Sequence, residues 1–240
     1  MSGNYLSNLM TVLKGTKDSD SFYAVDKDLI ELLAEFGASQ VLDDYWVLNR
    51  SARISLAMRA ISSGAEPESV VNLLSWKDFE GLVAGILEEN DYRCVESFRR
   101  LGTSRMQGME IDVIGVRGER IVVVDAKMWG VRTGKSSALK SAAERQRERT
   151  GRLCGEVDRF AEKVGGLRRG IYTLTPILVT WLVEEVILNE GVPIVPVFKL
   201  NSFILEISNY EDMIVSYECR YQRDPHDSPR SHRPERNSLV

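Results

Sequence analysis

The chain has 240 residues, a formal net charge of -4, and 43% hydrophobic and 28% charged residues. This length can bury the core of one large domain or two modest ones, and the composition excludes a disordered, fibrous or membrane chain. The longest apolar run, Pro176–Val183, is followed by Glu184 and Glu185 and falls well short of the roughly 20 residues that span a bilayer, so no membrane partner is expected. The N-terminus lacks the basic-then-apolar order of a secretion signal, so a cytoplasmic location is expected.

Cysteine and histidine usage excludes several kinds of catalytic site. The three cysteines are odd in number and include no close pair, so the sequence predicts neither a disulfide framework nor a Cys-x-x-Cys site, and a reducing compartment fits best. The two histidines, His226 and His232, lie in a polar C-terminal tail, which argues against a Ser-His-Asp unit and against histidine-bound zinc. The chemistry is therefore expected to use carboxylates, lysines, hydroxyls and a bound metal.

The charge is unevenly distributed along the chain. Residues 1–75 contain six Lys/Arg and ten Asp/Glu, a net charge of -4, whereas residues 128–170 contain eleven and five, a net charge of +6. The chain as a whole therefore has no attraction for nucleic acid, and any such attraction is expected to be local to the basic middle.

Residues 1–74 are predicted to form a small, mostly helical accessory domain. Apolar residues at helical spacing indicate helices over Asp26–Phe36 and Ser51–Ser63, and Pro67 opens another short helix through Leu74. A short strand is expected at Val41–Leu48. Several short helices around one strand would be compatible with a winged-helix-like module.

A second domain of the α/β class is predicted at residues 75–219. Ser75 and Asp78 resemble the capping box of a helix that runs to about Glu89. Two β-rich runs, Ile111–Val116 and Arg120–Lys127, indicate a hairpin.

The rest of this domain is expected to alternate helices and strands. We expect a basic helix at 136–163, a strand at 175–183, a short helix at 184–189 and a strand at 192–199. Such alternation after a hairpin favours a mixed sheet covered by helices on both faces. Residues 220–240 contain almost no apolar side chains and are expected to be disordered.

The predicted hairpin carries the chemistry. Period-two alternation places Asp125 and Lys127 on the same face of the second strand. If Gly118-Glu119 is a two-residue turn, Asp112 lies opposite Asp125 and Glu110 lies opposite Lys127. Opposed like charges destabilise a sheet unless a cation lies between them, and carboxylate oxygens favour Mg²⁺ or Mn²⁺ over zinc. The alternative is an ordinary Asp-Lys pair at an exposed strand end.

Three segments resemble the motifs of the PD-(D/E)XK nuclease superfamily, most closely its Mrr-type restriction endonuclease and archaeal Holliday-junction-resolvase branches. They are Trp-Lys-Asp-Phe-Glu-Gly-Leu-Val at 76–83, Gly-Met-Glu-Ile-Asp-Val-Ile-Gly at 108–115 and Val-Val-Asp-Ala-Lys at 123–127. The resemblance covers roughly residues 75–199. It implies a restriction-endonuclease-like mixed sheet flanked by helices.

The resemblance also implies roles for four residues. Asp112 matches the central metal ligand, Asp125 the second acidic ligand and Lys127 the catalytic lysine. Glu80 matches a helix-borne glutamate that holds or orders the metal site, although it also fits a solvated position on an amphipathic helix. The implied activity is that of a Mg²⁺- or Mn²⁺-dependent endonuclease that hydrolyses phosphodiester bonds in DNA.

The basic segment after the hairpin is the candidate nucleic-acid surface. The residues expected to follow a phosphate backbone are Lys135, Lys140, Arg145, Arg149 and Arg152. Gln146 is expected to touch the scissile region, as a helix-borne glutamine does in related nucleases. The alternative is a solvated helix face whose arginines pair with Glu144 and Glu148.

Two other functions stay open from the sequence. One is a nuclease-like protein with idle carboxylates that only binds nucleic acid or assembles with partners. The other is a nuclease directed at RNA, since phosphodiester cleavage does not itself distinguish the sugar. Cutting both strands of DNA would be simplest for a homodimer.

Overall fold

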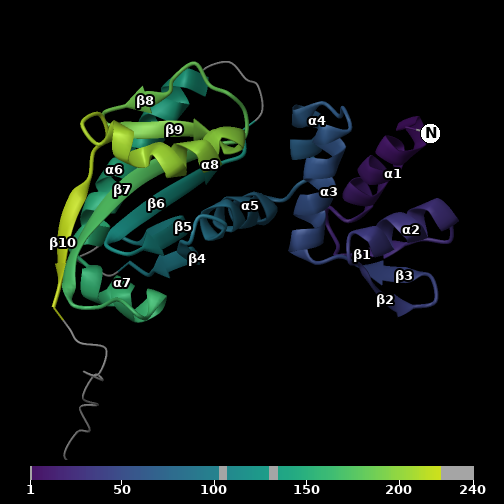
Figure 1. Cartoon of the computed structure of the whole chain (residues 1–240), viewed down its shortest axis with the longest axis horizontal. Coiled ribbons are helices and arrows are strands. Elements are labelled where there is room, and N and C mark those ends of the chain that lie inside the picture. The colour runs from purple at the N-terminus through teal and green to yellow at the C-terminus, as the bar shows by residue number, and fades with distance from the viewer. Residues whose placement is uncertain (1, 103–106, 130–134, 223–240) are drawn as a thin grey trace, which may run out of the picture.

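The computed structural model describes residues 2–102, 107–129 and 135–222, which form two units (Figure 1). We call residues 2–74 the N-terminal unit and residues 75–222 the C-terminal unit. Figure 1 shows the N-terminal unit beside helix α5, with the large sheet on the other side of that helix. None of the helices in the described ranges is long and apolar enough to cross a membrane.

The N-terminal unit combines helices with a small antiparallel sheet. Its elements are α1 (Ser2–Gly15), β1 (Ser21–Tyr23), α2 (Lys27–Glu35), β2 (Ser39–Leu42), β3 (Tyr45–Val47), α3 (Arg50–Ser62) and α4 (Pro67–Val71). The three strands pair in the order β1-β3-β2. The Asp26 side chain caps α2 by accepting from the amides of Asp28 and Leu29, which agrees with the predicted helix start. The single strand predicted at 41–48 is two strands joined by a turn.

The C-terminal unit confirms the predicted mixed sheet flanked by helices. Its elements are α5 (Trp76–Glu88), β4 (Arg93–Arg100), β5 (Met109–Arg117), β6 (Arg120–Lys127), α6 (Lys135–Cys154), α7 (Val157–Val164), β7 (Gly170–Thr180), β8 (Leu188–Asn189), β9 (Val192–Pro196), α8 (Val197–Glu206), a 3₁₀ turn (Ile207–Tyr210) and β10 (Tyr217–Tyr221). The capping box predicted for Ser75 and Asp78 is present at the start of α5.

The strands of the large sheet run in both directions. Their order is β4-β5-β6-β7-β9-β8, and β10 also pairs with β7. The β4, β5 and β6 strands are antiparallel neighbours, whereas β6 runs parallel to β7 and β7 parallel to β9. The long strand β7 is shared, because its first half pairs with β10 and its last residues pair with β9.

Helices cover both faces of this sheet, as the predicted alternation of buried residues requires. On β6, Val122 and Val124 pack into the core beneath α5 and α8, whereas Ile121 and Val123 pack into the core beneath α6 and α7. The ring of Trp181 is fully buried and contacts both Phe79 of α5 and Phe198 of α8 edge-on. The apolar alternation of β6 is therefore what sends Asp125 and Lys127 to the α6 face.

Several predicted elements differ from the structure. The helix expected at 136–163 is two helices that are separated at Gly155-Glu156. The helix expected at 184–189 is wrong, because this segment lies in bends and in the short strand β8. The strand expected at 192–199 ends at Pro196, where α8 begins. The disorder expected from residue 220 is wrong for Arg220 and Tyr221, which belong to β10; the rest of that expectation, at 223–240, lies outside the described ranges.

The two units are joined by two ionic contacts of α3, one buried and one exposed. Arg53 is 2% exposed, and its Nε lies 3.3 Å from Oδ2 of Asp78 in α5. The same guanidinium donates to the carbonyl of Leu73 and to Thr16 Oγ1. One turn earlier, Arg50 makes two 2.7 Å hydrogen bonds to Glu96 of β4. A boundary at residue 74 stays a prediction, but the parts on either side of it share a core.

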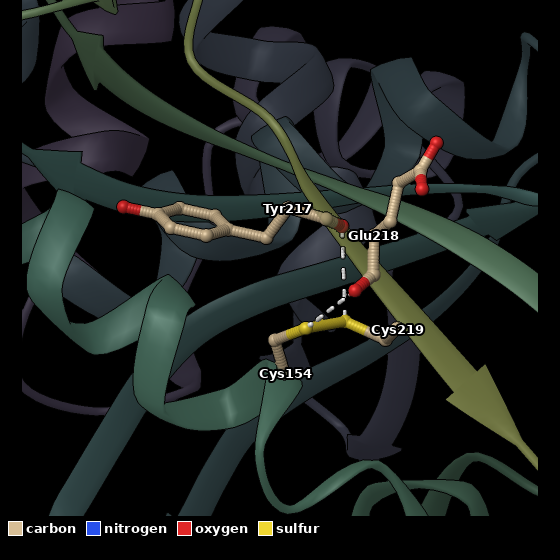
Figure 2. Close-up of a disulfide and its surroundings, with 4 residues drawn as sticks. All are labelled: Cys154, Tyr217, Glu218 and Cys219. Atoms are coloured by element: carbon tan, nitrogen blue, oxygen red, sulfur yellow. Dashed lines mark hydrogen bonds between the residues drawn. A yellow bond between two sulfur atoms is a disulfide. The ribbon is translucent and has the colours of Figure 1, made fainter.

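A disulfide joins Cys154, the last residue of α6, to Cys219 in the middle of β10 (Figure 2). The two Cα atoms are 5.3 Å apart although 65 positions separate the cysteines in the chain. The sulfurs lie 3.3 Å and 3.7 Å from the carbonyl oxygens of Glu218 and Tyr217. The prediction that the cysteines form no disulfide is wrong for this pair, because the fold closes a separation that the sequence pattern does not reveal.

Candidate active site

The β5–β6 hairpin has the predicted register over most of its length. Arg117 pairs with Arg120 across a turn in which Gly118 has a φ of 59°, and the ladder continues to the pair Val113–Val124. It ends there, one step before Asp112 would face Asp125. On the other side, β4 and β5 also omit the pair formed by Asp112 and Ser97.

The break in both ladders changes the direction of the side chains around Asp112. Ile111 and Ile114 pack into the same core cluster, whereas Val113 between them packs into the opposite one. Ser97, across from Asp112 on β4, has a φ of 48°. The predicted ladder pair of Asp112 and Asp125 is therefore not formed. Instead, Asp112 Oδ2 accepts a 2.7 Å hydrogen bond from the backbone N–H of Ala126.

Asp112 lies in an environment that opposes its negative charge. Burial raises the pKa of its carboxyl above the usual range, and the charge of Asp125 raises it further. The Ala126 N–H, Lys127 and Arg149 act in the opposite direction. The net direction is upward, and burial is its main cause, so the carboxylate form of Asp112 is destabilised in the folded protein. A bound cation would stabilise that form.

Asp125 is 3% exposed and is held between two cations. Its Oδ2 lies 2.8 Å from Lys127 Nζ, and its Oδ1 lies 3.0 Å from Arg149 Nη1 on α6. The lysine follows from strand periodicity, because residues two apart share a face. The arginine is a partner that the sequence analysis assigned only to phosphate, since no local spacing links α6 to β6.

Glu80 is the third carboxylate near the hairpin. It is 2% exposed, so the alternative of a solvated position on α5 is wrong. The pKa of Glu80 is raised to about 7, mainly by burial and further by the charge of Asp112, while the 3.3 Å hydrogen bond from Ser97 Oγ acts in the opposite direction. We call Glu80, Asp112 and Asp125 the carboxylate cluster.

The donor set of the carboxylate cluster fits a hard divalent cation, but its geometry is not that of a closed metal cage. In the described ranges no three His, Cys, Asp or Glu side chains converge as ready metal ligands. Asp112 and Glu80 offer carboxylate oxygens whose pKa values are raised by burial and, to a smaller extent, by a neighbouring carboxylate. Carboxylate oxygens are suitable ligands for such a cation. Both oxygens of Asp125 face cations, so a metal there would replace Lys127 or Arg149 at one oxygen.

Helix α6 places Gln146 and Arg149 against β6. Gln146 is fully buried and donates a 2.7 Å hydrogen bond to the carbonyl of Val123, while its Oε1 accepts from Arg149. The prediction that Gln146 touches nucleic acid is therefore corrected, because its side chain is used to position Arg149 and to satisfy a strand carbonyl.

The other predicted basic residues lie in three different settings. Lys135 is half-buried and paired, because its Nζ lies 2.6 Å from Glu184 Oε1 and its side chain is 11% exposed. A direct phosphate contact by Lys135 is therefore not supported. Arg145 and Arg152 are exposed on the same flank of α6 as Arg149, at helical steps of four and three. Lys140 is exposed on the opposite flank.

The alternative pairing scheme for α6 is absent from the described residues. Arg147 pairs with Glu190 at 2.9 Å, and Arg149 pairs with Asp125. Within the part of the chain that the structure describes, no arginine of α6 pairs with Glu144 or Glu148. The helix is therefore not a self-contained ladder of ion pairs.

Glu110 does not lie across from Lys127 as predicted. It is exposed and accepts two hydrogen bonds from Arg99 of the neighbouring strand β4, at 2.8 and 2.6 Å. The β5–β6 ladder ends at the pair Val113–Val124, before the position at which Glu110 would face Lys127.

Comparison with known proteins places this site within a recognised domain. The family model Mrr_cat, described as a restriction endonuclease, matches residues 71–152. An uncharacterized protein of Archaeoglobus fulgidus is 28% identical over 137 residues, which is 57% of this chain and 95% of that protein.

Two solved structures show a weaker likeness. They are protein VC1899 from Vibrio cholerae, at 15% identity and a TM-score of 0.34, and Can2 from Sulfobacillus thermosulfidooxidans in complex with cyclic tetra-adenylate, at 10% identity and a TM-score of 0.33. The matches cover 88% and 85% of this chain, which spans 52% and 51% of the length of those chains.

The matched segment contains the hairpin, the helix-borne glutamate and most of α6. Residues 71–152 therefore carry an Mrr-type restriction endonuclease domain of the PD-(D/E)XK superfamily.

Proposed function

We propose that this chain is an endonuclease that hydrolyses phosphodiester bonds in DNA with Mg²⁺ or Mn²⁺. The metal would be held by Asp112 and Asp125, with Glu80 as a further ligand or an ordering group. The observation that carries the proposal is the meeting of Asp112, Asp125 and Lys127 at one end of the β5–β6 hairpin. Lys127 Nζ lies 2.8 Å from Asp125, and Asp112 binds the amide of the residue between them.

The metal, Lys127 and Arg149 would each have a different role in the hydrolysis. A bound metal would polarise the phosphoryl oxygens and stabilise charge on the leaving oxygen. The ammonium of Lys127, paired with a carboxylate, has three N–H donors and no lone pair, so it would orient the attacking water or a phosphate oxygen rather than remove a proton. Arg149 keeps Asp125 in place and offers further N–H groups to a phosphate.

The proposal is tested by a nuclease assay on the full chain. Supercoiled plasmid, linear duplex, branched DNA and single-stranded RNA are each incubated with Mg²⁺, with Mn²⁺ and with EDTA. We expect cleavage of DNA with either metal and none with EDTA. Cleavage of RNA alone would replace the DNA proposal with the RNA alternative. Binding of DNA without cleavage under any metal would favour the idle, binding-only alternative.

Substitutions at the proposed site residues, compared with one at a neighbouring residue, test which side chains cleavage requires. We expect Asp112→Asn and Lys127→Gln each to lower the cleavage rate by more than about 10²-fold, because one removes a ligand charge and the other removes the group that orders water. The matched control is Glu110→Gln, which lies on the same strand two residues from Asp112 but has its side chain hydrogen-bonded to the exposed Arg99. Equal losses in Glu110→Gln and Asp112→Asn would contradict the proposed site.

A homodimer is the simplest form in which one protein would cut both strands. Light scattering on the protein, alone and with a duplex, tests this part separately. A monomer that nicks only one strand would contradict the homodimer but would not contradict the proposed site.

A further inference from the structure

A pocket of about 550 Å³ lies at the other end of the β5–β6 hairpin from the carboxylate cluster. It is formed by the entry to β4, the turn at 116–119 and the loop at 166–172. Strand β6 leads from the pocket to Lys127, and its eight residues at roughly 3.3 Å each separate the two ends by about 23 Å. The pocket is therefore distinct from the candidate active site.

Arginine is the main charged residue type in this pocket. Arg93, Arg117, Arg168 and Arg169 line it together with two acids, Asp91 and Glu119, which leaves a formal excess of two positive charges. Within the described ranges Arg93, Arg168 and Arg169 make no side-chain hydrogen bond and no ion pair, with either acid or with any other residue. This differs from the candidate active site, where the cations are paired.

Contacts at Arg117 and at the backbone of Arg168 hold the wall of the pocket in place. Arg117 is held by a 3.2 Å hydrogen bond to the carbonyl of Asn90 and by the ring of Tyr92, whose centroid is 4.6 Å away. The hydroxyl of the buried Tyr172 accepts from the amide of Arg168 at 2.9 Å and donates to its carbonyl at 2.8 Å. The backbone at Arg168 is thus fixed while its side chain faces solvent.

The loop approaches Arg93 closely because it contains a glycine. Gly166 has a φ of 62°, and a Cβ atom there would lie 2.4 Å from Arg93 Nη1. Any larger residue would force the guanidinium away from the loop. The conformation of the loop and the position of Arg93 are therefore linked.

We propose that this pocket binds a phosphate-bearing ligand of about nucleotide size. Planar guanidinium groups bind phosphate through paired N–H donors, and several unpaired ones together suit a group with more than one negative charge. The volume matches that of small-ligand sites, and Asp91 and Glu119 provide acceptors for hydroxyl or amino groups on the same ligand. The phosphate would come either from a free nucleotide or from the backbone of a nucleic acid bound beyond the candidate active site.

The test measures binding, so it does not depend on cleavage. Asp112→Asn protein in EDTA is titrated by calorimetry with pyrophosphate, with a nucleoside diphosphate and with a short single-stranded oligonucleotide. The titrations are repeated in the same background with Arg168→Gln/Arg169→Gln. The charge-matched control is Lys17→Gln/Arg59→Gln, whose exposed side chains lie in the N-terminal unit. Melting temperatures confirm that each variant is folded.

We expect at least one probe to bind, and we expect the Arg168/Arg169 variant to weaken it by at least about tenfold while the control changes it by less than twofold. Saturable binding of the diphosphate identifies a free nucleotide as the source. Binding of the oligonucleotide alone, with the same loss, identifies a nucleic-acid backbone. No binding of any probe, or an equal loss in the control, overturns the proposal. If the wild-type protein cleaves nothing in the nuclease assay, the binding result still stands, and only the proposed function is contradicted.

Discussion

Asp112 and Asp125 lie on neighbouring strands, but the surroundings of Asp112 destabilise its negative charge, whereas those of Asp125 stabilise its negative charge. Asp112 accepts one backbone hydrogen bond and has a pKa raised by burial and by Asp125. Asp125 faces the cations Lys127 and Arg149 through both oxygens. Removal of one negative charge from this pair should therefore have different effects on stability at the two positions.

We expect Asp112→Asn to raise the melting temperature in EDTA by about 2–4 °C, because the amide oxygen still accepts from Ala126 while the buried charge is gone. Asp125→Asn should lower stability by about 1–3 kcal/mol, because it leaves two partly buried cations without a carboxylate. Calorimetry of both variants at neutral pH checks this. Stabilisation by Asp125→Asn would mean that its ion pairs contribute nothing.

Glu80 should make the stability of the metal-free protein depend on pH. Its pKa is raised to about 7 from an ordinary 4.5, so between these values the folded protein holds a proton that the unfolded chain has released. The contribution of this group to stability is therefore highest at low pH and falls as the pH rises to about 7. We expect Glu80→Gln to remove this part of the slope in melting temperatures measured from about pH 5 to about pH 7.5 in EDTA. An unchanged slope would contradict the buried environment of Glu80.

The sequence allows part of the site to be predicted. Strand periodicity is a local rule, so it places Asp125 beside Lys127 and both on the face that α6 covers. The break of the ladder at Asp112 could not be predicted, because it depends on the conformation of Ser97 on another strand. The charge of Arg149 is visible in the sequence, but its contact with Asp125 arises from the crossing of α6 over the sheet.

At the scale of the element, α6 has one flank toward the carboxylate cluster and one flank toward β8. Arg145, Arg149 and Arg152 share the first, and only Arg149 contacts the cluster. Lys140 and Arg147 share the second, where Arg147 is paired with Glu190. The basic helix is therefore expected to use only one of its flanks for nucleic acid.

We expect Arg145→Gln/Arg152→Gln to weaken DNA binding equally for all sequences and to reduce the slope of log affinity against log salt by about 0.9 for each phosphate that is no longer neutralised. Cleavage by the bound fraction should be retained, because the carboxylate cluster is unchanged. Arg149→Gln should instead reduce cleavage, since it removes a partner of Asp125. Lys140→Gln is the control on the other flank, and a slope change equal to that of the double variant would show that the flank does not matter.

Secondary structure is predictable where one local pattern dominates. The capped helix α5 and the β5–β6 hairpin follow from a capping box and a two-residue turn. Strand β4 has the sequence pattern of a polar loop, because it contains three arginines and a glutamate at an edge of the sheet. The start of α8 directly after Pro196 escapes prediction because its apolar residues continue the pattern of β9.

At the scale of the whole molecule, two long-range links hold separate parts of the chain together. Arg53 joins the N-terminal unit to α5 through a buried ion pair. The disulfide between Cys154 and Cys219 joins α6 to β10, and α6 in turn carries the partner of Asp125. The stability of the site should therefore depend on contacts remote from it.

Reduction of the disulfide should lower the free energy of unfolding by about 2–5 kcal/mol, because the loop that it closes becomes free in the unfolded chain. Urea titrations of the oxidised protein, of the protein in reductant and of Cys154→Ser/Cys219→Ser check this. The last two should agree with each other. Identical midpoints for all three would mean that the cysteines are not bonded in the protein under test.

The disulfide also defines a covalent ring that begins at the end of α6 and closes at β10. The exposed Arg168 and Arg169 lie inside this ring, whereas the carboxylates lie outside it. A single cut by trypsin at these arginines would leave β6 and its parallel neighbour β7 on different fragments that remain covalently joined. The nicked protein should migrate as one band without reductant and as two with it, because the sulfur bridge would then be the covalent link between the fragment that carries β6 and the fragment that carries β7.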